Sequence, residues 1–380
     1  MAQSITSPEI VNIIVNIPVN KINDFLESIG ITPIQQGETY SFSFDSSLLL
    51  YGATLLYGPV FDMKDILENL IGTNLYPIDG VDSSKFPSPI HAACQASNLE
   101  IVKILVKCGA NIELINKNGY TPLHIAAQLS TIEIVKFLLE NGANFNARAE
   151  NGTTTLYLAC QEGRDDLVEL LLNKGAEVKI SCVFGYTPIY VASGKGHVNI
   201  VKMLLQYGAD PNVQEDNGST PIYIASQYGY HEIVEILIDA GAQIDIPTLE
   251  GHVALYMASK QGHHKVVELL AKYDNLEVDK LMPNGGTALY FACQEGFTKV
   301  VEILVKLNNT NINKLMPNGG TALYIACQNR HCEIVQLLLE NGADYNSSYA
   351  GNIPSPFVLA SHNRYYDIVE LLLTKSNMCK

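Results

Sequence analysis

The chain repeats itself at an interval of about 33 residues, and this period constrains its fold more than any other feature. The pair Thr121-Pro122 is followed, at steps of 33 residues, by Thr154-Thr155, Thr187-Pro188 and Thr220-Pro221. Weaker copies of the pair continue as far as Ser355-Pro356. A repeat of this length folds as one small unit that buries its apolar face only by stacking on its neighbours. The sequence therefore predicts a stack of similar units whose function is carried by an extended surface.

Each unit has the pattern of two helices that follow a tight turn. In the unit that contains Asn118-Gly119, this dipeptide predicts the turn, and Thr121-Pro122 predicts the start of a short first helix. A second helix is expected from Ile132 to Glu140, where apolar residues recur at the spacing of one helical face. Gly142 predicts the end of this helix, because glycine readily adopts the left-handed conformation that closes helices.

The stretch Thr121-Pro122-Leu123-His124-Ile125-Ala126 resembles the signature T-P-L-H-x-A of the ankyrin repeat. Glu133-Ile134-Val135 and Gly142-Ala143-Asn144 extend the likeness, and nine tandem units cover residues 84 to 375. The resemblance implies an all-α solenoid of helix-turn-helix units with β-hairpin loops.

Three segments are expected along the chain. Residues 1–80 carry only a degenerate copy of the repeat, at 52–79, and we interpret them as an N-terminal cap or a small domain. Aromatic residues alternate near residues 39–44, which predicts a short β element there. Residues 81–375 are expected to form the repeat array, and residues 376–380 a tail.

The motif histidine is kept as His91 and His124 and becomes tyrosine in the next six units. In the family that the chain resembles, this histidine ties the hairpin to the helix by hydrogen bonds. We interpret the tyrosines as a ladder that does the same structural work. They are Tyr157, Tyr190, Tyr223, Tyr256, Tyr290 and Tyr324.

Four of the eight cysteines share one register position of the repeat, where other units place alanine or serine, as at Ala127 and Ser361. The four are Cys94, Cys160, Cys293 and Cys327. A position that accepts alanine, serine or cysteine is a small-residue packing position between helices, and not a metal or redox site. The cysteines show no C-x-x-C spacing, which suits a reducing compartment.

Charge and motifs exclude several classes of function. Acidic residues outnumber basic ones by 39 to 24, which argues against nucleic-acid binding and favours a protein partner with a basic surface. Residues 1–8 give no sign of a secretory signal, and the apolar stretch at 48–61 is too short to span a membrane. The sequence contains no nucleotide-binding, hydrolase or zinc motif. We therefore expect a monomeric, non-enzymatic, cytoplasmic protein without a cofactor or metal.

Apolar residues at the hairpin tips are the first candidate partner-binding surface, because a solvated turn does not need them. They are Val183, Phe184, Tyr186, Leu249, Leu281, Met282, Leu315 and Met316. The alternative, that these side chains fold back onto the neighbouring hairpin, stays open.

The end of each first helix is the second candidate surface, since the ankyrin resemblance implies a partner-binding groove along these helices. The groove candidates are Gln161, Glu162, Lys195, Tyr228, Gln261, Glu295 and Asn329. The alternative is a surface that is merely solvated.

The sequence as a whole predicts a scaffold that binds partner proteins through its tips and groove. One alternative is an adaptor that selects substrates for an active element in residues 1–80. The other is an effector that a pathogen secretes into the host cytoplasm. Abundant Ile, Asn, Lys and Tyr without Trp suit an AT-rich genome, and intracellular bacterial pathogens are among the organisms that use ankyrin proteins.

Overall fold

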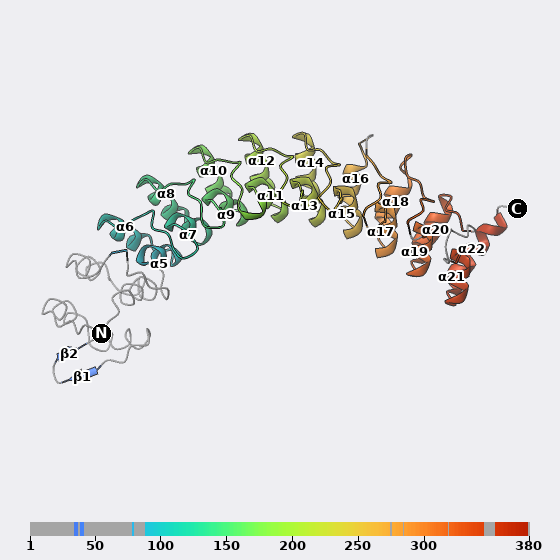
Figure 1. Ribbon diagram of the computed structural model, residues 1–380, viewed down its shortest axis with the longest axis horizontal. Coiled ribbons are helices and arrows are strands. Elements are labelled where there is room, and N and C mark those ends of the chain that lie inside the picture. Colours follow the sequence, from blue (N-terminus) through green and yellow to red (C-terminus); the bar gives the residue numbers. More distant parts are fainter. Residues whose placement is uncertain are drawn as a thin grey trace. The chain divides into compact units, whose positions relative to one another are not determined.

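The computed structural model describes residues 34–36, 39–41, 78–79, 88–273, 276–283, 285–317, 319–345 and 354–378. The chain divides into two compact units, Met1–Glu177 and Val178–Lys380, and Figure 1 shows paired helices in each of them. The cap or small domain expected in residues 1–80, with its degenerate repeat at 52–79, lies almost entirely outside the described residues.

The first unit contains three helix pairs in its described part. They are α5 (Pro89–Gln95) with α6 (Leu99–Lys107), α7 (Pro122–Leu129) with α8 (Ile132–Glu140), and α9 (Thr155–Gln161) with α10 (Asp165–Asn173). Helix α7 packs between α5 and α9, and α6 packs on α8. Two short strands, β1 (Ile34–Gln36) and β2 (Thr39–Ser41), pair antiparallel. The β element expected near residues 39–44 is confirmed at Thr39–Ser41, and residues 42–44 lie outside the described part.

The second unit contains six helix pairs in its described part. They are α11 (Pro188–Lys195) with α12 (Val198–Gln206), α13 (Pro221–Tyr228) with α14 (His231–Asp239), α15 (Ala254–Gln261) with α16 (His264–Leu270), α17 (Ala288–Glu295) with α18 (Thr298–Val305), α19 (Ala322–Gln328) with α20 (Cys332–Glu340), and α21 (Pro356–His362) with α22 (Tyr366–Met378). First helices pack on first helices and second helices on second helices. The helix α22 reaches Met378 and so replaces most of the tail expected at 376–380, because no glycine or proline stops it.

A threonine begins the first helix of most described repeats. The backbone N–H of His124 donates to Thr121 Oγ1 at 3.4 Å, and the backbone N–H of Thr121 donates to His124 Nδ1 at 3.1 Å. The two residues thus form a capping box. Because Nδ1 accepts a hydrogen bond, the ring proton lies on Nε2, which donates to the carbonyl of Thr153 in the next repeat at 3.1 Å. One side chain therefore caps its own helix and holds the following hairpin.

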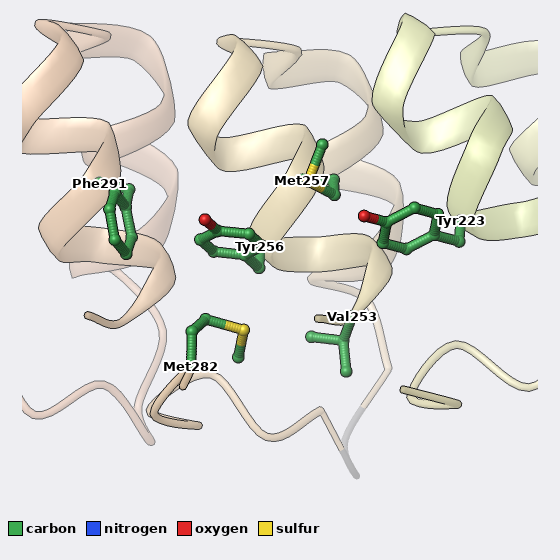
Figure 2. Close-up of a cluster of buried hydrophobic side chains, with 6 residues drawn as sticks. All are labelled: Tyr223, Val253, Tyr256, Met257, Met282 and Phe291. Carbon is green, nitrogen blue, oxygen red and sulfur yellow. The ribbon is translucent and has the colours of Figure 1, made fainter. Parts of the chain in front are cut away.

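Tyr190 takes over this link in a repeat where histidine is lost. The hydroxyl of Tyr190 donates to Ser219 Oγ at 3.3 Å, across the same 29 residues that separate His124 from Thr153. Figure 2 shows the rings of Tyr223 and Tyr256 inside a buried apolar cluster, where each reaches toward the next repeat. The interpretation of these tyrosines as structural residues is confirmed for Tyr190, Tyr223 and Tyr256 by their hydrogen bonding or burial.

The small-residue position of the first helix is fully buried in all but the last described repeat. Its occupants there are Cys94, Ala127, Cys160, Ser193, Ser226, Ser259, Cys293 and Cys327. The prediction is wrong for Ser361, which is exposed. The position is buried by the next helix pair, and no pair follows α21 and α22 in the described residues.

Serine at this position should cost stability. The hydroxyls of Ser193, Ser226 and Ser259 have no hydrogen-bond partner among the described residues, and a buried unsatisfied polar group costs about 1–3 kcal/mol. We predict that Ser226→Ala raises the free energy of unfolding in urea by about 1 kcal/mol. The control is Ser130→Ala, which removes a hydroxyl that donates to the carbonyl of Cys94 and should lower stability. Equal effects of the two changes would contradict this account.

Within the second unit, the residue that precedes each of the second helices α14, α16, α18 and α20 lies against a glycine of the repeat before it. His263 lies against Gly229, which ends α13 with a φ of 78°, and its Nε2 donates to the carbonyl of Gln227 at 2.9 Å. Phe297 covers Gly262 in the same way. A Cβ added at Gly229 would lie 2.5 Å from Nδ1 of His263, so glycine is required there for the contact between repeats as well as for its backbone conformation.

Two glycine substitutions separate the cost of backbone strain from the cost of losing the contact between repeats. Gly208 has a φ of 84° but no atom within 4 Å of an added Cβ, so Gly208→Ala should cost about 1–2 kcal/mol through backbone strain alone. Gly229→Ala carries the same strain and also displaces the His263 ring from its hydrogen bond, so it should cost more by about 1 kcal/mol or more. Urea unfolding followed by circular dichroism measures both, and an equal or smaller loss at Gly229 would refute the packing role.

Candidate functional site

The hairpin tips of the second unit carry exposed apolar side chains. The exposed fraction of these side chains runs from 42% at Leu281 to 81% at Leu249. The predicted exposure is confirmed for Val183, Phe184, Leu249, Leu281 and Leu315. Apolar side chains that water surrounds on rigid turns are available for contact with another molecule.

Met282 and Met316 do not belong to this surface, and their prediction as tip contacts is wrong. Only 3% of Met282 and 5% of Met316 is exposed. Figure 2 shows Met282 within the cluster that contains Val253 and Tyr256. Successive residues of an extended chain point to opposite sides, so Leu281 faces solvent while Met282 faces the helices.

Tyr186 packs on its own repeat, whereas the open alternative placed the tip side chains against the neighbouring hairpin. Its ring stacks on Tyr190 with a centroid distance of 5.1 Å and an interplanar angle of 3°. Phe184 lies 6.0 Å from Tyr186 between ring centroids but remains 62% exposed. The φ of Phe184 is 71°, a left-handed conformation that is strained for a bulky residue. Tyr186 therefore packs on the first helix of its own repeat, whereas Phe184 projects from the tip.

Backbone hydrogen bonds hold successive tips against one another. The N–H of Asp216 donates to the carbonyl of Phe184 at 2.9 Å, and the N–H of Leu249 donates to the carbonyl of Asn217 at 2.7 Å. The next tip has Pro283, which lacks an N–H, and an open depression lies there between Pro283 and the hairpin of Leu249. The tips from Phe184 to Leu249 thus form a fixed surface.

Beneath these tips lies Glu215, a carboxylate that the sequence reading missed. It is only 6% exposed, and the backbone N–H of Ser219 donates to its Oε1 at 3.3 Å. No described lysine, arginine or histidine forms an ion pair with it. The matching position holds Cys182 in the preceding repeat and Thr248 in the following one, so an acid at a position that is otherwise neutral was the available signal.

Three tyrosines near Glu215 are held in their neutral form. Burial raises the pKa of Tyr186, and the carboxylates of Glu215 and Asp216 add to the shift. Burial also raises the pKa of Tyr190 to about 12, with a further contribution from Glu215. The pKa of Tyr223 rises to about 12 through burial first, and the charges of neighbouring groups, Glu215 among them, add to it. The carboxylates therefore set the negative charge of this region.

The groove candidates lie at the ends of the first helices. Gln161 is half-buried. The predicted exposure is confirmed for Glu162, Lys195, Tyr228, Gln261, Glu295 and Asn329. Asn329 also donates from Nδ2 to the carbonyl of Gln294 in the preceding repeat at 2.8 Å, so it serves the stacking of repeats. Tyr228, which is 53% exposed, is the largest apolar body among the groove candidates.

The described residues show no centre for metal chemistry, since no three His, Cys, Asp or Glu side chains among them gather to hold a metal ion. None of the described helices has the length and apolar character needed to cross a membrane. The active element that the adaptor alternative places in residues 1–80 lies outside the described part.

Burial suppresses the chemistry of the four cysteines in the small-residue position. It raises the pKa of the Cys94 and Cys327 thiols to about 12 and that of Cys160 well above its usual value. It also raises the pKa of the Cys293 thiol. Because only the thiolate is a good nucleophile, these residues are inert at neutral pH.

We predict that iodoacetamide at pH 8 alkylates the exposed Cys108 rapidly and leaves Cys94, Cys160, Cys293 and Cys327 unmodified in the folded protein. Mass spectrometry of peptides follows each residue, and unfolding in urea provides the control because it should expose all four. Modification of these four at the rate of Cys108 in the folded protein would contradict their burial.

A comparison with family models matches the model described as ankyrin repeats (three copies) to this chain four times. The matches cover residues 60–149, 147–215, 207–281 and 274–349. They run without a gap from residue 60 to residue 349, which is more than half of the 380 residues. A search of curated proteins finds no match.

Proposed function

Because the chain belongs to the ankyrin-repeat family, whose repeats serve in general as protein-interaction scaffolds, we propose that it is a non-enzymatic scaffold for partner proteins. The partner contacts the tips formed by Val183, Phe184 and Leu249 and extends over the groove toward Tyr228. The single observation that carries the proposal is the row of exposed apolar side chains on hairpins that hydrogen bonds hold in place.

Strain at the tip supports the same assignment. A left-handed backbone costs about 1–2 kcal/mol for a residue other than glycine, and the matching residues Asn118, Asn151 and Asn217 do not adopt it. Phe184 therefore adds a strained and exposed aromatic side chain that neither the turn nor the core requires. Such strain is characteristic of binding positions.

We further propose that the scaffold begins before α5, with the degenerate copy at 52–79 as its cap. The backbone N–H of Asn111 donates to Asp79 Oδ1 at 2.8 Å. The backbone N–H of Asn144 donates in the same way to Glu113 Oε1, also at 2.8 Å, one repeat later. This repeated link, together with a family match that begins at residue 60, supports a repeat ahead of the first described helix pair.

Capture experiments on the full chain test the tip assignment. We predict that Val183→Ser, Phe184→Ser and Leu249→Ser combined reduce the recovery of partner proteins from cell extract at least about 10-fold, because they remove the apolar anchors. Quantitative mass spectrometry measures the recovery. The control combines Tyr207→Ser and Tyr273→Ser, which remove exposed aromatic side chains at the ends of the second helices. Equal recovery by the tip variant and the unchanged protein, with helical content preserved, would refute the tips as the binding surface.

A further inference from the structure

The carboxylate of Glu215 is the most unusual group beneath the proposed binding surface. It is nine-tenths buried, belongs to a register position that needs no charge, and has no ion-pair partner among the described residues. A buried carboxylate without a counter-charge is costly unless a cation meets it. One backbone hydrogen bond, from Ser219, does not supply that charge.

The surroundings of Glu215 favour a cation from outside the chain. Asp216 follows it on the exposed side of the hairpin, and Glu250 lies close enough for its charge and that of Glu215 to act on Tyr223 together. The one described basic group in contact with these carboxylates is His252, whose Nδ1 lies 3.4 Å from Glu250 Oε2. The local charge is thus negative, in keeping with a chain whose net charge is −15.

Aromatic rings lie in the preceding repeat, whose hairpin is held beside that of Glu215 by the hydrogen bond from the Asp216 N–H to the Phe184 carbonyl. Tyr186 and Tyr190 stack on each other, and Phe184 extends from Tyr186 toward solvent at an interplanar angle of 45°. Aromatic faces attract cationic side chains and also accept their methylene groups. A buried acid on one hairpin and an exposed phenyl ring on the adjacent hairpin suit a side chain that is apolar along its length and charged at its end.

We infer that Glu215 anchors a lysine or arginine side chain of the partner, while an apolar residue next to it in the partner packs on Phe184. The inference rests on the proposed function of the tips and adds the chemical class of the partner segment. The basic group supplies the counter-charge that Glu215 lacks, and the apolar neighbour covers the exposed ring. A partner segment of this kind is basic and apolar in alternation and binds an acidic surface by charge complementarity.

Selection from a random eight-residue peptide library on the full-length protein tests the inference. The selected peptides should share a lysine or arginine beside an apolar residue. Glu215→Gln keeps the shape and the acceptor for Ser219, yet it should weaken these peptides about 30-fold, because it removes the charge that meets their basic group. Glu235→Gln makes the same change of charge at an exposed position of α14 and should leave affinity within about 2-fold.

A double-mutant cycle between the protein and the peptide measures the interaction of Glu215 with the basic residue of the peptide. Replacement of the basic residue by norleucine should weaken binding to the unchanged protein by a similar factor and have little effect on binding to the Glu215→Gln variant. Fluorescence anisotropy gives the affinities. Because the variant removes an unpaired buried charge, its urea midpoint should be equal to or above that of the unchanged protein. This result would separate lost binding from lost folding.

Three outcomes would overturn the inference. The first is that the selected peptides lack a basic residue but bind more weakly to the variant with Val183→Ser, Phe184→Ser and Leu249→Ser. In that case the tips keep their proposed function, but Glu215 does not anchor the partner. The second is peptides that bind this variant and the unchanged protein equally, which would also count against the tips. The third is that Glu215→Gln and Glu235→Gln weaken peptide binding equally, which would mean that only the net charge of the protein matters.

Discussion

Contact between neighbouring repeats is the constraint on which the rest of the structure depends. A pair of short helices such as α7 and α8 buries its apolar face only against the pairs beside it. The small-residue position is fully buried in all but the last described repeat, and no side chain larger than cysteine occupies it there. The contact of His263 with Gly229 and the hydrogen bond from His124 to Thr153 each join two neighbouring repeats in the same way. These contacts fix the spacing of the repeats and hence the spacing of the hairpin tips.

Much of the fold follows from the sequence because the same contacts recur with the same residues. The helix Ile132–Glu140 has the bounds that its apolar spacing predicted, and the buried cysteines follow from sharing a position with Ala127. The predicted burial is wrong for Ser361 because this position is buried only where another repeat packs over it. The sequence of one repeat does not reveal whether such a neighbour follows. The short strand Ile34–Gln36 lacks the alternation that pointed to its partner Thr39–Ser41.

The binding surface is less predictable, since it depends on where single side chains point. Leu281 and Met282 are adjacent and equally apolar, yet only the leucine is exposed. Composition cannot separate them, whereas the alternation of an extended chain can, once its register is known. Glu215 was missed because acids in turns are common and usually solvated. Its burial follows from the hairpin geometry and from the nearby tyrosines, which are properties of two neighbouring repeats together.

Two residues that the repeat does not require, Phe184 and Glu215, lie on adjacent hairpins of the second unit. Phe184 adopts a conformation that glycine or asparagine would adopt at lower cost, and Glu215 buries a charge where alanine, threonine or methionine occurs in other repeats. The strained backbone of Phe184 weakens folding, and the array tolerates it because its stability is a sum over many similar boundaries. A repeat protein can therefore concentrate unfavourable residues in one repeat without unfolding the others. For this reason residues that the repeat does not require, and that make it less stable, are better guides to the binding site than exposure alone.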